Sequence, residues 1–402
     1  MLCQVTVSNY KCFRDSITLD LQATNISEHE NSLLISKDGE RFLPLSVIYG
    51  PNGGGKTNLL RALTCLITLV VSPIHELGKS RKKMIFQQKV LCEPFSFDKT
   101  SLNEPTEFNI FFRTNGSEYR YYIALKSDEI ISESLYRKTV GGKKTATIFE
   151  REGLEIELGA SLSKGSVNTE VNPKMPYLSF LAINYNFPKI AEVQEWFEAC
   201  IIRNYANPRV EMSMLISEDK MFKRNFLSAI NDMGIDISDY YLDKEHNDML
   251  LVRNINKESY PISFSSESDG TKKLFASLPI LMVAIAEGRL VIIDELDAKL
   301  HPKLLRYVIS LFTNREINKK GAQLIFTSHD MSTMKNDVFR RDEIWFAALD
   351  NEHSSELYSL CEIRKEDGNR INNTAAYDKQ YLEGRYGADP YLRTMLDWEE
   401  LL

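Results

Sequence analysis

The chain has 402 residues, of which 43% are hydrophobic and 26% charged, a composition typical of soluble globular proteins with ample core. Its length permits one large domain with insertions, or two to three domains of ordinary size. The formal net charge of -7 excludes a general positive field that would attract nucleic acid, although it leaves room for a local basic groove.

Six cysteines occur without a C-x-x-C pair, which in a chain of this length predicts reduced and mostly buried thiols in a cytosolic protein. The first residues, MLCQVTVSNYKCF, alternate like a strand and show no signal-peptide pattern. The longest apolar stretch, residues 62–71, is interrupted by Thr64 and Thr68 and is shorter than the roughly 20 residues that span a bilayer. We therefore expect a cytoplasmic protein without a membrane partner.

The N-terminal part of the chain predicts strands, then one helix, then further strands. CQVTV and SITLDLQA alternate, and LPLSVIYG is a near-continuous apolar run of the kind found in a buried strand. After Gly50 the apolar residues recur at helical spacing, and Pro73 lies just beyond the expected end of this helix. Residues 93–158 are β-rich, and Asn115-Gly116 between two strand-like runs predicts a hairpin.

The following region predicts a loop, two helices and two strands. Residues 159–177 are polar, and PKIAEVQEWFEACIIRNYA and SEDKMFKRNFLSAINDMG then carry helical periodicity, the second between Ser217 and Gly234. DMLLVRN and SYPISFS look like strands that return the chain to its core. These patterns divide the chain into an N-terminal part of the core with an antiparallel β lobe (1–158), a helical insertion (159–254), a C-terminal part of the core (255–350) and an extension (351–402).

GPNGGGKT, residues 50–57, fits the pattern G-x-x-x-x-G-K-[ST] in full, with an apolar strand before it and an amphipathic helix after it. Glycines allow successive N–H groups to point inward around a phosphate. In such a loop Lys56 reaches the β- and γ-phosphates, and Thr57 offers its hydroxyl to Mg²⁺. The motif predicts a nucleoside triphosphate site whose binding residues are Asn52, Gly53, Gly54, Gly55, Lys56, Thr57 and Asn58.

LVIIDE places Asp294 and Glu295 at the end of a buried strand. Asp294 suits the shell of a magnesium ion, and Glu295 is the candidate general base that activates the attacking water. The next strand, in GAQLIFTSHD, ends at His329, which can donate a hydrogen bond to the γ-phosphate or to the water. We therefore expect Lys56, Glu295 and His329 to be catalytic, with Thr57 and Asp294 as metal ligands.

Together with the polar segment SFSSESDGTKKLF, these motifs resemble the ABC-type ATPase layout of the Rad50, SMC and RecF proteins. The order is a P-loop, an S-x-G segment, Asp-Glu, D-x-x-L-H-P, and a strand that ends in histidine. The resemblance implies an α/β fold with an ABC-type P-loop NTPase core, a β-rich N-terminal lobe and a helical insertion, and it implies that ATP binds with Mg²⁺.

The same resemblance implies that the site is shared between two subunits. Ser268 and Gly270 take the place of a signature motif, which caps the γ-phosphate bound to the opposite subunit of a head-to-tail dimer. Asp297 would lie in the loop that crosses this interface. The stretch between Gly270 and Asp294 fits one helix and a turn before the next strand.

NYKCF, SDGTKKL, DELDAKLHP, AQLIFTSHD and YLEGRYGADPYL look like the AAA15 family of predicted ATPases, relatives of the OLD-family proteins. The similarity is specific in the C-terminal third and vague between residues 75 and 255. It implies a role in bacterial defence against phage beside a separately encoded nuclease or effector, and it implies that Lys11 approaches the nucleotide. Because the chain ends before a Toprim nuclease domain, we expect any nuclease to act in trans.

One departure concerns the glutamine that ligates Mg²⁺ in this clan, which we expect near LSFLAINYNF; Asn184 stands there, and Gln87 or Gln88 could also serve. The alternative function is a DNA-repair ATPase like RecF or Rad50. Rad50 needs long coiled coils and a C-x-x-C hook, and this sequence has neither, so a RecF-like role is the one that stays open. In that case KSRKKM and GGKK could contact nucleic-acid phosphates. A regulatory protein that holds ATP and barely hydrolyses it is a further alternative.

Overall fold

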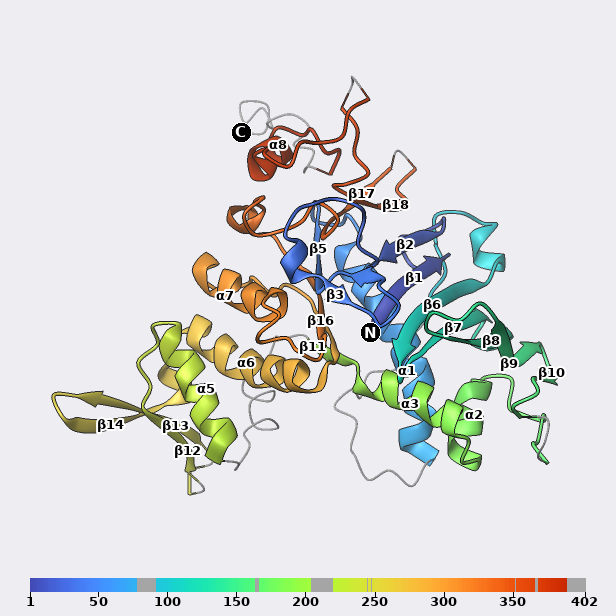
Figure 1. The fold of residues 1–402 in the computed structure, drawn as a ribbon, viewed down its shortest axis with the longest axis horizontal. Coiled ribbons are helices and arrows are strands. Elements are labelled where there is room, and N and C mark those ends of the chain that lie inside the picture. The colour runs from blue at the N-terminus through green and yellow to red at the C-terminus, as the bar shows by residue number, and fades with distance from the viewer. Residues whose placement is uncertain are drawn as a thin grey trace, which may run out of the picture.

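The structure is a computed structural model, and its elements build two large sheets and a smaller projecting one (Figure 1). The basic cluster KSRKKM and the candidates Gln87 and Gln88 lie outside the residues that it describes. The described residues are 1–77, 92–162, 166–203, 220–243, 245–246, 248–350, 352–365 and 368–388.

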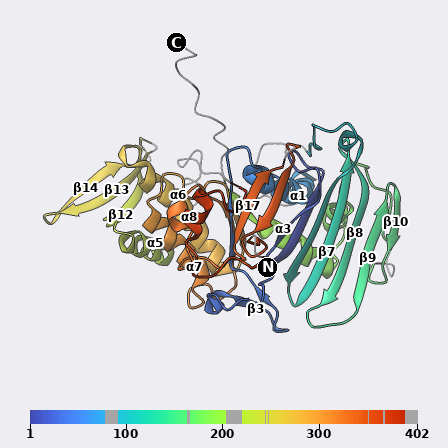
Figure 2. The same ribbon diagram turned by 90° about the horizontal axis from the view of Figure 1, so that it is seen from above.

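Within these ranges, an antiparallel sheet of seven strands forms the N-terminal lobe, at the right of Figure 2, in the order β10-β9-β8-β7-β6-β1-β2. The hairpin predicted at Asn115-Gly116 is confirmed, because both residues have positive φ and Thr114 pairs with Ser117 across a two-residue turn. The strands are β1 (Leu2–Ser8), β2 (Ile17–Asp20), β6 (Thr106–Thr114), β7 (Ser117–Lys126), β8 (Glu129–Thr139), β9 (Thr145–Glu152) and β10 (Glu155–Leu158).

The core sheet has the order β11-β15-β16-β5-β17-β18 in the described part of the chain, and only β18 runs antiparallel to its neighbour. Its parallel strands end at one edge, so the loops that follow β5, β15 and β16 meet there. The strands are β5 (Leu45–Tyr49), β11 (Ile201–Arg203), β15 (Leu290–Ile293), β16 (Gln323–Thr327), β17 (Ile344–Leu349) and β18 (Ser355–Ser359).

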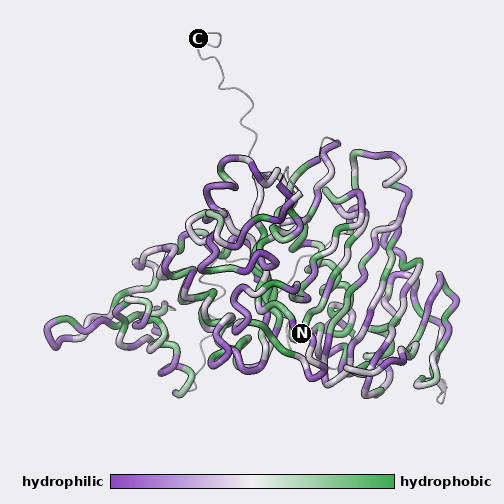
Figure 3. The backbone as a smooth tube through the Cα atoms, turned by 45° about the horizontal axis from the view of Figure 1, so that its top comes forward, coloured by the Kyte–Doolittle hydropathy of each residue, from purple (hydrophilic) through white to green (hydrophobic). Residues whose placement is uncertain are grey.

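Helices cover this sheet on both faces, and two hydrophobic cores result. Ile48 of β5 packs into the core shared with α1 and the β lobe, whereas Leu45, Val47 and Tyr49 pack into the core with α6 and α7. Figure 3 shows hydrophobic stretches running through the strands of both large sheets. The α/β prediction with a β-rich N-terminal lobe is confirmed. The helices of the cores are α1 (Lys56–Leu77), α2 (Tyr177–Asn184), α3 (Pro188–Ala199), α6 (Asp269–Glu287) and α7 (Pro302–Thr313).

The remaining described elements are short or peripheral. They are α5 (Lys220–Asp232), α8 (Tyr377–Leu382), the two-stranded sheet of β3 (Leu34–Ile35) and β4 (Arg41–Phe42), and the 3₁₀ turns η1 (Glu30–Ser32), η2 (Ser101–Asn103), η3 (Phe264–Ser266) and η4 (Met331–Thr333).

Helix α1 continues through Pro73, which the sequence placed beyond the end of the helix. Val70, Val71 and Ile74 are buried around this proline, and their packing outweighs the cost of an interior proline, about 3 kcal/mol. By length and composition alone α1 could cross a membrane. Because its apolar side chains are buried in the core and its first residue is the P-loop lysine Lys56, it is a core helix.

The predicted return of two strands to the core is confirmed only in part, because Met249 and Leu251 are buried in the core with α6 and α7 but neither strand joins the core sheet. DMLLVRN and SYPISFS do form strands, but they pair with each other and with β12 in a separate sheet that projects from the molecule (Figures 1 and 2). A tight turn at Asn256-Lys257, with positive φ at both residues, favours this local pairing. We call residues 239–263 the wing: β12 (Asp239–Asp243), β13 (Asp248–Ile255) and β14 (Glu258–Ser263).

The segment predicted as a helical insertion also contributes to the core. Its helices α2, α3 and α5 are present, and α5 ends two residues before Gly234, while the predicted start at Ser217 lies outside the described residues. Between α3 and α5, however, β11 pairs in parallel with β15 at the edge of the core sheet. Three residues are too few to reveal such a strand in the sequence, because only the pairing with β15 defines it.

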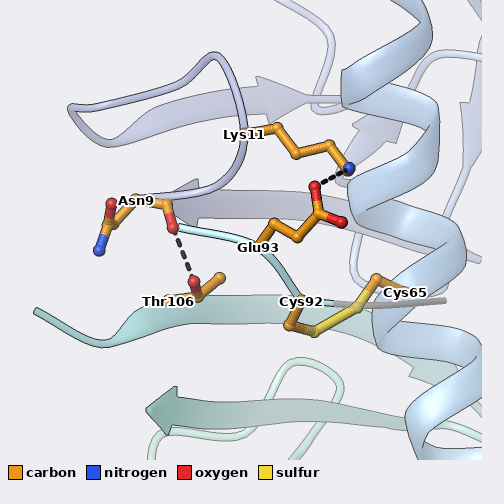
Figure 4. The surroundings of a disulfide bond; sticks show 6 residues. All are labelled: Asn9, Lys11, Cys65, Cys92, Glu93 and Thr106. Carbon is orange, nitrogen blue, oxygen red and sulfur yellow. Dashed lines mark hydrogen bonds and ion pairs between the residues drawn. A yellow bond between two sulfur atoms is a disulfide. The ribbon is translucent and has the colours of Figure 1, made fainter. Parts of the chain in front are cut away.

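The cysteine prediction is wrong for one pair. Cys65 on α1 is joined to Cys92 by a disulfide, with Cα atoms 6.6 Å apart (Figure 4). The free cysteines are Cys3, Cys12, Cys200 and Cys361. The two bonded cysteines are 27 residues apart in sequence and meet because the segment that leads into β6 begins beside α1.

Candidate nucleotide-binding site

Strand β5 delivers the glycine-rich loop to the edge where the parallel strands end, and α1 begins at its lysine. Gly50 has φ of 144°, and a Cβ atom there would lie 2.1 Å from the carbonyl oxygen of Ala347. Gly55 has φ of 106°, and its Cβ would lie 2.7 Å from the hydroxyl oxygen of Ser355. Strands β17 and β18 therefore pack against this loop so closely that only glycine fits at either position.

The loop forms one wall of a pocket of about 170 Å³, and the ends of β15 and β16 form the other. Most of the predicted site residues meet here, although Gly54 does not line the pocket and instead backs onto Ala347. The lining residues are Pro51, Asn52, Gly53, Gly55, Lys56, Thr57, Asn58, Asp294, Glu295, Thr327 and His329.

Lys56 is only 6% exposed, and its ammonium donates hydrogen bonds to the carbonyl oxygens of Gly50 at 2.8 Å and Pro51 at 2.9 Å. Burial lowers the pKa of Lys56, while the nearby Asp294 and Glu295 act in the opposite direction. Anionic oxygens form stronger hydrogen bonds with an ammonium than carbonyls do. The lysine is therefore held at a place where phosphate would be its better partner.

Asp294 is tied to both walls of the pocket. Its Oδ1 accepts hydrogen bonds from the hydroxyl of Thr57 at 3.3 Å and from that of Thr327 at 2.6 Å. Carboxylate and hydroxyl oxygens are the hard ligands that Mg²⁺ takes, usually together with water. Thr57 and Asp294 therefore fit a magnesium ion between the loop and β15.

Thr327 is a site residue that the sequence motifs did not predict. It is completely buried, and besides donating to Asp294 its hydroxyl accepts a hydrogen bond of 2.7 Å from the backbone N–H of Glu295. The only signal in the sequence is a hydroxyl residue at the end of the strand that leads to His329. Its bridging position depends on β16 lying beside β15, and the sequence alone does not predict that these two strands are neighbours.

Glu295 has a left-handed backbone with φ of 50°, and its exposed side chain lines the pocket. A non-glycine residue in this region is uncommon and stays there only when its neighbours hold it. Thr327 holds its N–H, and the ammonium of Lys273 donates to its carbonyl oxygen at 2.6 Å. The candidate general base is thus fixed through its backbone, and its carboxylate makes no hydrogen bond to any described residue.

His329 lines the opposite side of the pocket, and its backbone N–H donates to Oδ2 of Asp297 at 2.9 Å. Among the described residues, Oδ1 of Asp297 is buried and has no hydrogen-bond partner. Asp297 therefore positions the segment that carries His329 and keeps one carboxylate oxygen uncommitted, although it does not line the pocket itself.

Four residues that the sequence suggested for the site do not line the pocket of their own chain. The ammonium of Lys11 pairs with Glu93 at 2.6 Å, next to the disulfide (Figure 4). Asn184 donates to the carbonyl oxygen of Phe180 within α2. Ser268 and Gly270 lie at the N-terminus of α6, where the Ser268 hydroxyl caps the helix through the Thr271 N–H at 3.2 Å.

The glycine-rich loop joins a strand to a helix and holds the buried Lys56. Thr57 pairs with Asp294 across the pocket, and two further acids, Glu295 and Asp297, follow at the same strand end. This arrangement defines a P-loop protein that binds a nucleoside triphosphate. Residues 45–335 match the family described as "AAA domain, putative AbiEii toxin, Type IV TA system". The match covers well over half of the chain, so the chain belongs to this family, and it is a P-loop ATPase.

Three solved structures are similar to this chain at low identity. The SMC head domain from Thermotoga maritima shares 13% identity over 89% of this chain and 98% of that one, with a TM-score of 0.42. The recombination mediator protein RecF shares 14% over 89% and 98%, with a TM-score of 0.35. A dimeric ATP-binding cassette bound to ADP and Pi shares 10% over 89% and 100%, with a TM-score of 0.31. A comparison with curated proteins gave no match.

Proposed function

We propose that this chain is an ABC-type ATPase that works as a switch in a head-to-tail dimer or a higher oligomer built from such dimers. The observation that carries the proposal is that Ser268 and Gly270 do not line the pocket of their own chain. Ser268 is exposed at the N-terminus of a 19-residue helix, and such a terminus attracts anions. A second copy placed head to tail would bring this terminus to the phosphates held by Lys56.

The residues of the pocket divide the hydrolytic work. Glu295 accepts the proton of the water that attacks the γ-phosphate, and Lys56 stabilises the negative charge that develops on the phosphate oxygens. Thr57 and Asp294 would hold Mg²⁺, which neutralises phosphate charge when bound. His329 directs the attacking water or the γ-phosphate. Because hydrolysis removes the phosphate that Ser268 of the second copy contacts, the dimer opens after turnover.

We further propose that the protein is cytoplasmic and serves bacterial defence against phage with a separately encoded nuclease or effector. The wing supports the partner part of this proposal, because it projects from the core and exposes large apolar side chains. These side chains are between 43% and 52% exposed and belong to Tyr241, Leu242, Ile255 and Tyr260.

A Glu295→Gln variant tests the dimeric switch, because it keeps the pocket but lacks the base. We expect it to retain ATP and to elute as a dimer in size-exclusion chromatography with light scattering, whereas a Lys56→Ala control stays monomeric under the same conditions. A Glu295→Gln chain that binds ATP and stays monomeric at saturating nucleotide would rule out the proposal.

The same preparation separates defence from DNA repair. A RecF-like function requires DNA binding that depends on ATP and weakens steeply with salt, as phosphate contacts do. We expect the Glu295→Gln dimer to show no such binding in a fluorescence anisotropy titration with duplex DNA. Salt-sensitive binding that appears only with ATP would favour the repair function over defence.

A further inference from the structure

We propose that Lys273 is a positioning residue that couples the two ATP sites of the dimer. This inference rests on the head-to-tail arrangement proposed above. It begins from the contact between the first turns of α6, which carry Ser268 and Gly270, and the turn formed by residues 295–299, which carries the base of the same chain.

Lys273 makes the central contact. Its side chain is 5% exposed, and its ammonium donates hydrogen bonds to the carbonyl oxygens of Glu295 at 2.6 Å and Ala298 at 2.8 Å. A buried ammonium is costly unless it is fully partnered, and burial lowers the pKa of Lys273 to about 8. The two carbonyl oxygens therefore stabilise the buried ammonium, and the ammonium in turn fixes the backbone of residues 295–298.

Two further contacts join the same elements. The carboxylate of Asp269 pairs with the ammonium of Lys299 at 3.1 Å. A Cβ atom at Gly270 would lie 2.8 Å from the carbonyl oxygen of Lys299, so the glycine lets the helix touch the backbone of the turn. Glu295 and Lys299, at the two ends of the turn, both have positive φ. The start of α6 thus supports a turn whose backbone is strained at both ends.

The contact couples the two ATP sites because its two ends, the start of α6 and the turn at 295–299, belong to different sites. In the proposed dimer, Ser268 of one copy faces the ATP of the other, whereas Glu295 serves the ATP bound by its own chain. Lys273 lies little more than one helical turn after Ser268, so the two residues move together. When Ser268 closes on the second ATP, Lys273 transmits the shift to Glu295 in the first site. ATP in one site therefore sets the position of the base in the other.

The test measures ATP hydrolysis as a function of ATP concentration for the full chain and three variants. Lys273→Met removes the ammonium at similar length, and Lys273→Gln keeps a donor without the charge. The matched control is Lys272→Met, which removes the neighbouring lysine, whose ammonium lies 3.9 Å from the Asp269 carboxylate and makes neither carbonyl contact. Thermal unfolding of each variant shows whether it is folded.

We expect a Hill coefficient well above 1 for the unmodified chain and for Lys272→Met, with an upper limit of about 2 for two coupled sites. Lys273→Met should fall to about 1 while its combination with Glu295→Gln still dimerises with ATP. If Lys273→Met does not fold, the Hill coefficient of Lys273→Gln is measured instead, and it should also be lower than that of the unmodified chain.

Two results would overturn the inference. One is a folded Lys273 variant that keeps the Hill coefficient of Lys272→Met, and the other is an unmodified chain that dimerises with ATP and hydrolyses it without cooperativity. Failure of Glu295→Gln to dimerise would instead refute the proposed function, so the two failures are distinguishable.

Discussion

Replacing Thr327 with valine removes one hydroxyl and leaves the shape of the side chain almost unchanged. In the structure this hydroxyl donates to Asp294 at 2.6 Å and accepts from the N–H of Glu295 at 2.7 Å, with no exposed surface on the residue. One oxygen atom therefore fixes the position of the candidate metal ligand, Asp294, relative to the candidate base, Glu295. We expect Thr327→Val to reduce both stability and turnover, and to reduce turnover more than ATP affinity.

The magnitude follows from the two bonds lost. A hydrogen bond to a charged group contributes about 1.5–3 kcal/mol, and a buried N–H left without a partner costs about 1–3 kcal/mol. Because the two terms share one atom and relaxation recovers part of them, the free energy of unfolding should fall by about 2–4 kcal/mol. A displaced Glu295 that loses about 1.5–3 kcal/mol of transition-state stabilisation lowers kcat roughly 10- to 150-fold.

Steady-state ATP hydrolysis and urea unfolding of Thr327→Val and Thr327→Ser provide the measurement. Serine keeps the hydroxyl and should retain most of kcat, whereas the KM for ATP should change little in either variant because Lys56 and the loop are intact. The reasoning is refuted if folded Thr327→Val has a kcat within about twofold of Thr327→Ser, a difference of less than about 0.5 kcal/mol in the barrier.

Three further predictions concern the surroundings of the site. Gly50→Ala adds a Cβ 2.1 Å from the carbonyl oxygen of Ala347 at a φ of 144°, so it should destabilise the fold by about 2 kcal/mol or more and weaken binding of a fluorescent ATP analogue. Reduction of the disulfide between Cys65 and Cys92, 27 residues apart, should lower the free energy of unfolding by about 3 kcal/mol, whereas the double Cys→Ser variant should not respond to reductant. Glu343 is buried directly before β17, and this burial raises its pKa to about 8. The stability that its proton contributes is therefore fully present below its ordinary pKa of about 4.5 and is lost as pH rises through about 8. Urea unfolding between about pH 5 and pH 9 should show this loss in the unmodified chain and a flatter profile in Glu343→Gln.

The sequence predicts best those features that depend on neighbours along the chain. The P-loop requires glycines, Lys56 and Thr57 at fixed spacing between a strand and a helix, and the structure places them in one pocket. The hairpin at Asn115-Gly116 requires only two residues that tolerate positive φ. In both cases the local backbone conformation is enough to fix the outcome.

Features that depend on distant contacts were not predictable in the same way. Thr327 joins Asp294 only because β16 lies beside β15, and Lys11 meets Glu93 only because residues 93–95 bond to the loop that follows β1. The wing is a similar case. Its strands are recognisable in the sequence, but their choice of partner is decided by the turn at 256–257 and not by their apolar pattern.

The start of α6 contacts the turn at 295–299 and, in the proposed dimer, the ATP of the second copy. It is also connected to the wing, which extends the coupling inferred for Lys273. Arg253 of β13 donates two hydrogen bonds to the carboxylate of Glu267, one of them 2.9 Å long, and Glu267 directly precedes Ser268. A bidentate pair of this kind fixes orientation as well as distance. An effector that binds the exposed side chains of the wing would therefore shift Ser268 toward or away from the ATP of the second copy, and through Lys273 it would shift Glu295 as well. In the proposed dimer, one helix terminus would therefore connect the wing to both active sites.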